Sequence, residues 1–260
     1  MWMPSCQPGC NHEKEMNITT EYFKEVDSTN NYLASRRPVG EDEMIVAWTD
    51  YQKAGRGCGT NSWESERGKN LTCSVLFRPR GVPAKDQFIL SMVNALALKT
   101  ALSQYIGEVS IKWPNDIYWN DRKLCGTLIE PTLQGSHIKD CIIGTGINVN
   151  QREFLSDAPN PVSMAQILGH DTDREAVLND TVHCLVGYLE QVAGGHWDQL
   201  RNEYRASLYR RGGVHGFRHP DGRVEPFRYV DGSNDGHLLL QRPHNRELLA
   251  FAFKEIGFVI

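Results

Sequence analysis

The segment that decides the fold is residues 112–130, which reads KWPNDIYWNDRKLCGTLIE. Two strand-like runs, 116–119 and 124–130, flank four polar residues, 120–123, whose composition is typical of a hairpin turn. Ahead of them, a lysine, a tryptophan and a carboxylate fall within 112–116, and Lys123 follows. These groups can supply a cation for phosphate, a stacking surface and an acceptor for ribose or magnesium. Trp113 could also be plain core and Asp116 a turn residue, but the segment is too polar and rigid for a routine strand.

Strands and helices are predicted on both sides of this segment. A capping residue at Asp27 or Ser28 precedes a short helical pattern, and the helical period of 87–105 predicts a core helix. Strands are predicted at 44–48, 71–77, 109–113 and 138–143. Helices are predicted at 162–168 and 175–209, the second broken at Gly194-Gly195.

The chain is predicted to divide into a flexible leader over 1–20, a large domain over 21–211 and a smaller unit over 212–260. The smaller unit has short strands, divided by Asp221-Gly222, Asp231-Gly232 and Asn234-Asp235-Gly236. At about 48 residues it is near the lower limit for independent folding, so we expect it to dock on the large domain.

Composition excludes several classes of protein. With 40% hydrophobic and 23% charged residues among 260, the chain is neither disordered nor fibrous, and a net charge of −4 gives no general attraction to nucleic acid or anionic membrane. The apolar run 88–102 is shorter than the roughly 20 residues of a membrane span. No export signal is evident, so the seven cysteines are predicted to be reduced thiols in the cytoplasm. Cys6, Cys10 and His12 lack a second ligand pair, and no metal site is expected.

Two further polar segments contain glycines at every second position. In the segment 51–63, glycines would let backbone N–H groups approach a phosphate, and Arg56 adds a permanent charge. This is not the dinucleotide-binding fingerprint, because Thr60 stands at the third glycine position, which excludes a Rossmann oxidoreductase. The segment 144–150 is predicted to be a turn in which Asn148 offers an amide to a base edge.

In this order and spacing, the three segments resemble the biotin protein ligase family from Glu21 to Ile260. The other matching features are 27–30, 68–71, 123–130 and 251–255. The resemblance implies an α+β fold, in which a catalytic domain like that of class II aminoacyl-tRNA synthetases and lipoate ligases has a mixed, mostly antiparallel sheet packed with helices. A small SH3-like barrel follows it.

The resemblance also implies a two-step reaction. The carboxylate of biotin attacks the α-phosphate of Mg²⁺-bound ATP to give biotinyl-5′-AMP, and a lysine on the biotin carrier domain of acetyl-CoA carboxylase or a related carboxylase then attacks the anhydride. A monomer or homodimer is expected. Only 27 residues precede Ser28, too few for a DNA-binding domain, so a short form without DNA binding is expected.

Site residues follow from the resemblance, residue by residue. Lys123, Arg56 and Asp116 are expected to be catalytic, with Lys123 at the carboxyl oxygen and α-phosphate and Asp116 orienting it or assisting the metal. Biotin is expected to contact Ser28, Thr29, Asn30, Gln52, Arg56, Gly57, Cys58, Lys123 and Gly126. The nucleotide is expected to contact Trp63, Lys112, Asn115, Gly144, Gly146 and Asn148.

One departure from the family affects the loop. Where many members have two further arginines, this chain has Cys58 and Asn61. Either Arg67, Lys69 or Lys53 substitutes for them, or backbone N–H groups of 57–60 hold the phosphate. Two alternative functions stay open: a lipoate or octanoate ligase of the same fold, and a biotin-binding regulatory protein without turnover.

Overall fold

A seven-stranded mixed sheet organises most of the chain. The computed structural model describes residues 16–36, 40–59, 62–155, 160–233 and 235–260. The sheet order is β1-β2-β3-β7-β6-β5-β4; β1 pairs with β2 in parallel, and all other neighbours are antiparallel, as predicted. The strands are β1 (Asn17–Phe23), β2 (Glu43–Thr49), β3 (Leu71–Phe77), β4 (Ser110–Lys112), β5 (Asp116–Trp119), β6 (Arg122–Gln134) and β7 (His137–Ile147).

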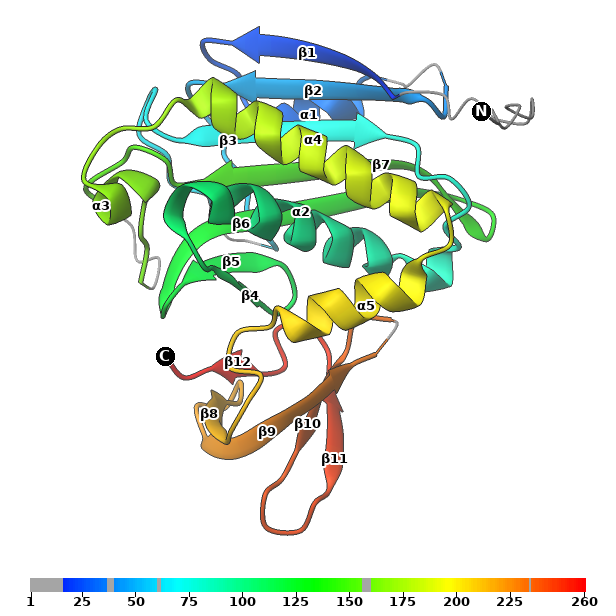
Figure 1. Ribbon diagram of the computed structural model, residues 1–260, viewed down its shortest axis with the longest axis vertical. Helices are drawn as coiled ribbons and strands as arrows, with labels where there is room; N and C mark the ends of the chain where they lie inside the picture. The colour runs from blue at the N-terminus through cyan, green and yellow to red at the C-terminus, as the bar shows by residue number, and fades with distance from the viewer. Residues whose placement is uncertain (1–15, 37–39, 60–61, 156–159, 234) are drawn as a thin grey trace, which may run out of the picture.

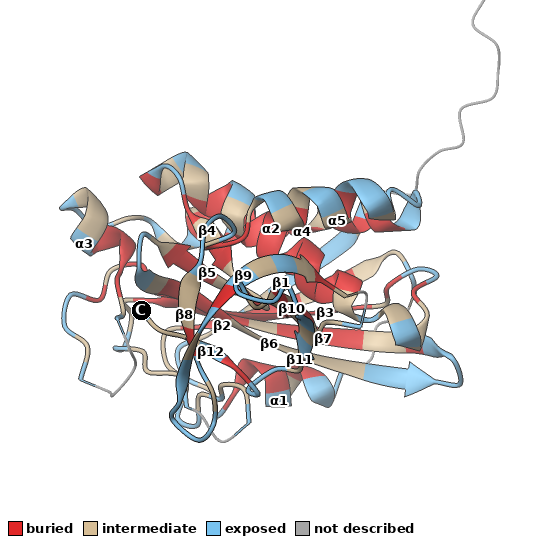
Figure 2. Ribbon diagram, turned by 90° about the horizontal axis from the view of Figure 1, so that it is seen from below, coloured by how far each residue is buried: buried red, intermediate tan, exposed pale blue. Residues whose placement is uncertain are grey.

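The two faces of this sheet are covered unequally. The helices α2 (Phe88–Ile106), α4 (Arg174–Ala193) and α5 (Trp197–Ala206) lie on one side, and the short α1 (Thr29–Ala34) lies on the other (Figure 1, Figure 2). A 3₁₀ turn (Ala84–Asp86) precedes α2, and α3 (Met164–Leu168) precedes α4. Since α1 has six residues, much of its face of the sheet is left uncovered by helix.

Strand β3 shows how the sequence sets up the two faces. All seven of its residues are buried. Cys73, Val75 and Phe77 belong to the large core beneath α2 and α4, while Leu76 packs in a small cluster with Leu33 of α1. Alternation along the strand therefore places Ser74 on the face of α1, which is the face where a site can open.

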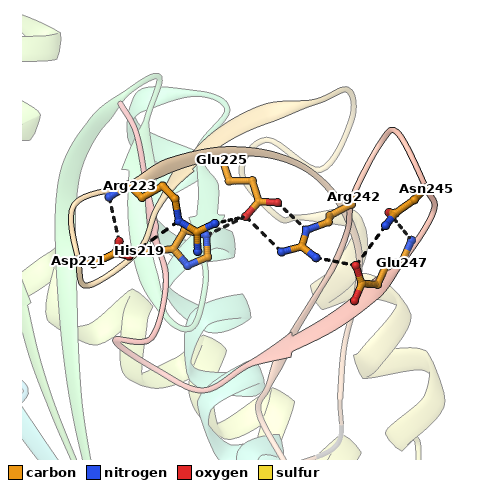
Figure 3. Close-up of polar contacts among 7 residues, drawn as sticks. All are labelled: His219, Asp221, Arg223, Glu225, Arg242, Asn245 and Glu247. Atoms are coloured by element: carbon orange, nitrogen blue, oxygen red, sulfur yellow. Dashed lines mark hydrogen bonds and ion pairs between the residues drawn. The ribbon is translucent and has the colours of Figure 1, made fainter.

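Residues 215–258 form a second, five-stranded antiparallel sheet of order β11-β10-β9-β8-β12. Its strands are β8 (His215–Arg218), β9 (Val224–Gly232), β10 (Leu238–Gln241), β11 (Leu248–Phe251) and β12 (Gly257–Phe258). Phe217, Phe227 and Leu240 fill its small core. On its surface Glu225 accepts a hydrogen bond of 2.5 Å from Arg242, which also binds Glu247 and so ties β9 to the β10–β11 hairpin (Figure 3). The hydrogen bond from Arg242 lowers the pKa of Glu225.

The C-terminal sheet docks on the large domain, as predicted. The Phe253 ring packs edge-on against Trp113, with 6.1 Å between centroids. The Lys112 ammonium lies 5.6 Å from the centroid of the Phe258 ring, and Arg205 of α5 pairs with Asp231 of β9 at 2.5 Å. The C-terminal unit therefore contacts both Lys112 and Trp113, the first two residues of the segment 112–130 that decides the fold.

Four predictions about where strands, helices and turns lie are wrong. Strand β1 begins at Asn17, inside the range assigned to the leader; its first four residues are exposed, so no apolar alternation marks them. Helix α5 ends at Ala206 rather than Tyr209, because Ile111 of β4 exchanges backbone hydrogen bonds with Ser207 and Tyr209. Asp231-Gly232 lies within β9 and does not divide two strands. The segment 144–147 is the end of β7, not a turn.

The predicted hairpin turn over 120–123 is confirmed in part: Asn120-Asp121 joins β5 to β6, but Arg122 and Lys123 already belong to β6, with Trp119 opposite Arg122. The predicted break of the helical stretch at Gly194-Gly195, between α4 and α5, is confirmed. The described cysteines, Cys58, Cys73, Cys125, Cys141 and Cys184, are free thiols. Within the described ranges, no helix combines the length and apolarity of a membrane span, and no three metal-ligating side chains cluster. The leader residues 1–15, Thr60, Asn61 and Asn234 lie outside the described residues.

Candidate active site

The candidate site lies on the α1 face of the sheet, over strands β6 and β7. Gly126 and Gly146 stand opposite each other in the two strands, and Gly144 is two positions along. A Cβ on Gly146 would lie 2.2 Å from Cε2 of Trp63, and one on Gly126 would lie 3.0 Å from Cζ3 of the same ring. The glycines therefore form a floor without side chains on which Trp63 rests.

A network of neutral polar side chains forms one end of the site. The backbone N–H and hydroxyl of Thr29 donate to Gln52 Oε1 at 2.8 and 3.1 Å. The Thr29 hydroxyl lies 2.6 Å from that of Ser74, which donates to Asn30 Oδ1 at 2.5 Å. Thr29, Asn30 and Ser74 are each less than 5% exposed. Ser28 caps α1, with its hydroxyl accepting from Asn31 N–H at 3.5 Å, so the helix start positions the network.

Asn30 fits against the floor because Gly144 has no side chain. A Cβ on Gly144 would lie 2.0 Å from Asn30 Oδ1. The Asn30 amide in turn donates to Glu130 Oε2 at 2.7 Å. The same carboxylate oxygen accepts from Arg56 Nη2 at 2.5 Å. Glu130 thus links the polar end of the site to the glycine loop that carries Arg56.

The glycine loop is a hairpin over the site. Trp63 N–H donates to the Gly55 carbonyl at 3.2 Å, and Arg56 pairs with Ser62. Gly57 and Cys58 follow Arg56 and are partly exposed. The loop thus brings the predicted residues Arg56 and Trp63 to the same face as Gln52.

At the other end of the site, Lys123 and Asp116 form an ion pair, with 2.7 Å between Nζ and Oδ2. The pair brings two of the predicted catalytic residues together, and their roles in catalysis stay a prediction. Lys123 Nζ would lie 3.2 Å from a Cβ on Gly126, a position that also contacts Trp63, so the ammonium and the indole ring flank one glycine. The Trp63 indole N–H is buried and has no hydrogen-bond partner among the described residues. An unpaired donor beside an ammonium is suited to an anionic or polar ligand.

Three predicted nucleotide residues have other contacts. Lys112 Nζ lies 5.2 Å from the centroid of the Tyr118 ring and also faces the Phe258 ring. Burial lowers the pKa of Lys112; the charge of Lys123 lowers this pKa further, and the carboxylate of Asp116 raises it. Asn115 donates to the Ser91 hydroxyl of α2 at 3.1 Å. Asn148 is 3% exposed, and its amide donates to the carbonyls of Val162 and Lys123. These contacts hold strands and loops together, and ligand contact by the three residues stays a prediction.

Two of the cations proposed as substitutes for the missing loop arginines are already paired. Lys53 Nζ lies 2.9 Å from Glu25, and Arg67 binds the other oxygen of the same carboxylate. Hydrogen bonds from Arg67 and Lys53 lower the pKa of Glu25. Lys53 and Arg67 therefore hold the base of the loop and are not free for phosphate.

Two site residues were missed by the sequence analysis. Ser74 is a polar residue in the middle of a fully buried strand, and that interruption is a signal that could have marked it. Glu130 ends the run 123–130 that was noted only as a family feature. Its contacts with Asn30 and Arg56 span 100 and 74 positions of sequence, so no local pattern indicates them.

Comparison with known proteins gives the family. Residues 22–148 match the biotin/lipoate A/B protein ligase family. A biotin–[acetyl-CoA-carboxylase] ligase of Paracoccus denitrificans is 30% identical over 235 residues, covering 87% of this chain and 95% of that protein. The chain belongs to the biotin protein ligase family. Among solved structures, the family's ligase from Aquifex aeolicus in complex with biotin and ATP superposes with a TM-score of 0.73 at 26% identity, covering 94% of this chain and 98% of that one.

Other family members are longer than the matched region. The bifunctional ligase/repressor BirA of Bacillus subtilis is 33% identical over 173 residues, which is 64% of this chain and 51% of that protein. The chain thus spans about half the length of the BirA relatives of this family.

The close approach of Asn30 to Gly144 predicts that adding one methyl group at residue 144 lowers the stability of the protein. Gly144→Ala should destabilise the protein by about 1–3 kcal/mol, because its Cβ overlaps the Asn30 side chain and forces the polar network to move. The control is Gly187→Ala in α4, where nothing lies within 4 Å and the backbone is helical; it should be neutral or stabilising by up to about 1 kcal/mol. Urea unfolding of both variants measures this. Equal stabilities would show that Asn30 does not need the space at Gly144.

Proposed function

We propose that the protein is an ATP-dependent ligase that activates biotin as biotinyl-5′-AMP and transfers it to a lysine of a biotin carrier domain. The observation that carries the proposal is the layout of one sheet face. A neutral network (Thr29, Gln52, Ser74) lies at one end, and an ammonium (Lys123) lies at the other, over a glycine floor. Neutral donors and acceptors suit the uncharged ureido group, and the ammonium suits a carboxylate that meets a phosphate.

The chemistry follows from that layout. A carboxylate oxygen of biotin attacks the α-phosphorus of ATP, the new C–O–P anhydride forms, and the bond to pyrophosphate breaks. In the second step the amine nitrogen of the carrier lysine attacks the acyl carbon, an amide forms, AMP leaves and the nitrogen loses a proton. Lys123 stabilises the charge that develops on the carboxyl and phosphate oxygens, and Asp116 holds its ammonium in place.

Magnesium enters as the ion bound to ATP. The carboxylate of Asp116 is paired with Lys123, and no cluster of three ligating side chains occurs in the described ranges. Such a site fits Mg²⁺ that stays on the substrate phosphates with most of its waters. In that role it would neutralise phosphate charge during the attack.

The remaining proposals concern the setting of this activity. The Paracoccus relative is named for its action on acetyl-CoA carboxylase, which supports a biotin carrier domain of that enzyme or a related carboxylase as the partner. We further propose a division into a large domain that ends at residue 211 and a C-terminal unit over 212–260 with an SH3-like barrel, and action in the cytoplasm as a monomer or homodimer.

The experiment is incubation of the purified protein with biotin, Mg·ATP and a purified biotin carrier domain. The expected result is biotin-dependent pyrophosphate exchange and a carrier mass increase of one biotinyl group. Biotin binding without either reaction would support the regulatory alternative. Transfer of lipoate in place of biotin would support the lipoate ligase alternative.

The glycine loop, residues 53–65, should become more protected from hydrogen exchange when biotin and Mg·ATP bind. Few apolar side chains anchor it, and ordering costs about 1–2 kcal/mol per residue, so ligand contacts are needed to hold it closed over the labile anhydride. Exchange of 71–77 in β3 is the internal control and should not change. Equal, strong protection of the loop with and without ligands would show that it is closed beforehand.

A further inference from the structure

Lys254, in the C-terminal unit, lies against the glycine loop of the candidate site. Its Nζ donates to the Cys58 carbonyl at 3.3 Å, across 196 positions of sequence. The next loop residue, Gly59, has a φ of +71°, and a Cβ there would lie 2.5 Å from Lys254 Nζ. The loop therefore leaves room for this ammonium at the place where the family commonly has an arginine.

The turn that carries Lys254 is held in place. Lys254 has a φ of 72°, a conformation that costs a lysine energy and persists only when its surroundings fix it. The Ala252 N–H donates to the Glu255 carboxylate at 2.8 Å, and the Glu255 N–H donates to the Ala252 carbonyl at 3.1 Å. Phe253 packs on Trp113, next to the hairpin that carries Asp116. Lys254 is thus presented to the loop by a fixed turn.

The charge of Lys254 is available. Within the described ranges it forms no ion pair; its Nζ donates to a neutral carbonyl and lies 6.0 Å from the centroid of the Phe253 ring. Three other cations at the loop are engaged: Arg56 with Glu130, and Lys53 and Arg67 with Glu25. An ammonium that keeps donors free beside glycine N–H groups is suited to binding a polyphosphate.

We propose that Lys254 binds the phosphates of the nucleotide from the C-terminal unit and replaces the loop cation that is absent at Cys58. This rests on the proposed function, which supplies the nucleotide. It implies that the C-terminal unit completes the nucleotide site of this chain.

The test compares KM for ATP in biotin-dependent pyrophosphate exchange. Lys254→Ala should raise KM for ATP about 10- to 100-fold, as expected for one charge-assisted contact, and should change the Kd of biotin alone less than about 3-fold. Lys254→Arg should stay near the wild type. The matched control is Arg246→Ala, because Arg246 is also an exposed cation with positive φ (57°) in the C-terminal unit.

A second variant separates charge from structure. Adding Cys58→Arg to Lys254→Ala should recover most of the lost ATP affinity, since it restores a cation to the loop. A defect that persists in the double variant and in Lys254→Arg would show that Lys254 only holds the turn, and would overturn the proposal. The proposal would also be overturned if Lys69→Ala raised KM for ATP and Lys254→Ala did not.

Failure of the proposed function has a different signature. If the wild type forms no biotinyl-5′-AMP, Mg·ATP binding by calorimetry still compares wild type, Lys254→Ala and Arg246→Ala. Weaker nucleotide binding in Lys254→Ala alone would support the assignment even then. Identical Mg·ATP affinity in all three proteins would refute it whether or not the wild type is active.

Discussion

Replacing Lys123 with alanine should lower the rate of biotin-dependent pyrophosphate exchange about 100- to 1,000-fold, the usual cost of removing a group that stabilises charge in the transition state. Lys123 Nζ is the cation next to the Trp63 ring and the glycine floor, and Asp116 fixes it at 2.7 Å. Arg56→Ala should have a milder effect, because Arg56 is already paired with Glu130.

The control for Lys123→Ala is Lys85→Ala, which removes an exposed lysine from the 3₁₀ turn before α2. Both variants should unfold thermally within a few degrees of the wild type, because the Lys123–Asp116 pair is partly exposed and such pairs contribute little to stability. Exchange activity in Lys123→Ala equal to that of Lys85→Ala would remove Lys123 from the proposed mechanism.

The second large effect is selectivity. The ratio of kcat/KM for biotin to that for lipoate or octanoate should be about 10⁴ or more. The hydroxyls of Thr29 and Ser74 and the amides of Gln52 and Asn30 hydrogen-bond to one another. An acyl chain without a urea group offers no partner to the donor and acceptor positions that these groups leave unused. An unpaired buried polar group costs about 1–3 kcal/mol, and several such groups act together here.

This selectivity can be measured by pyrophosphate exchange with each acid in turn. Ser74→Ala should reduce the ratio, mainly through a higher KM for biotin, whereas Ser103→Ala at the far end of α2 should leave it unchanged. Comparable turnover of lipoate and biotin by the wild type would contradict the selectivity argument and favour the lipoate ligase alternative.

Much of the fold is predictable because its signals are local. Strand 71–77 is predicted at its observed bounds, since a short apolar run between polar turns has few other solutions. The helix predicted at 87–105 is observed at 88–106 for the same reason. Strand β1 is different: it is exposed, and only its parallel partner β2 makes it a strand.

The site shows the same division. Lys123 and Asp116 are seven residues apart, and the hairpin between them makes their pairing foreseeable. The glycines at 144 and 146 suggested a turn because glycine disfavours strands, yet their place in β7 is decided by Asn30 and Trp63, which need the space. The contacts of Glu130 and Lys254 join distant segments, so only the tertiary structure shows them.

The docking of the C-terminal sheet has a consequence for engineering by module exchange. Phe253 covers Trp113, Phe258 lies over Lys112, and Lys254 reaches Cys58, so the boundary runs through the segments that carry the chemistry. A chimera that joins the large domain to the C-terminal sheet of a relative has to re-form all three contacts. Transplants that move both partners of each contact together should retain activity where simple fusions lose it.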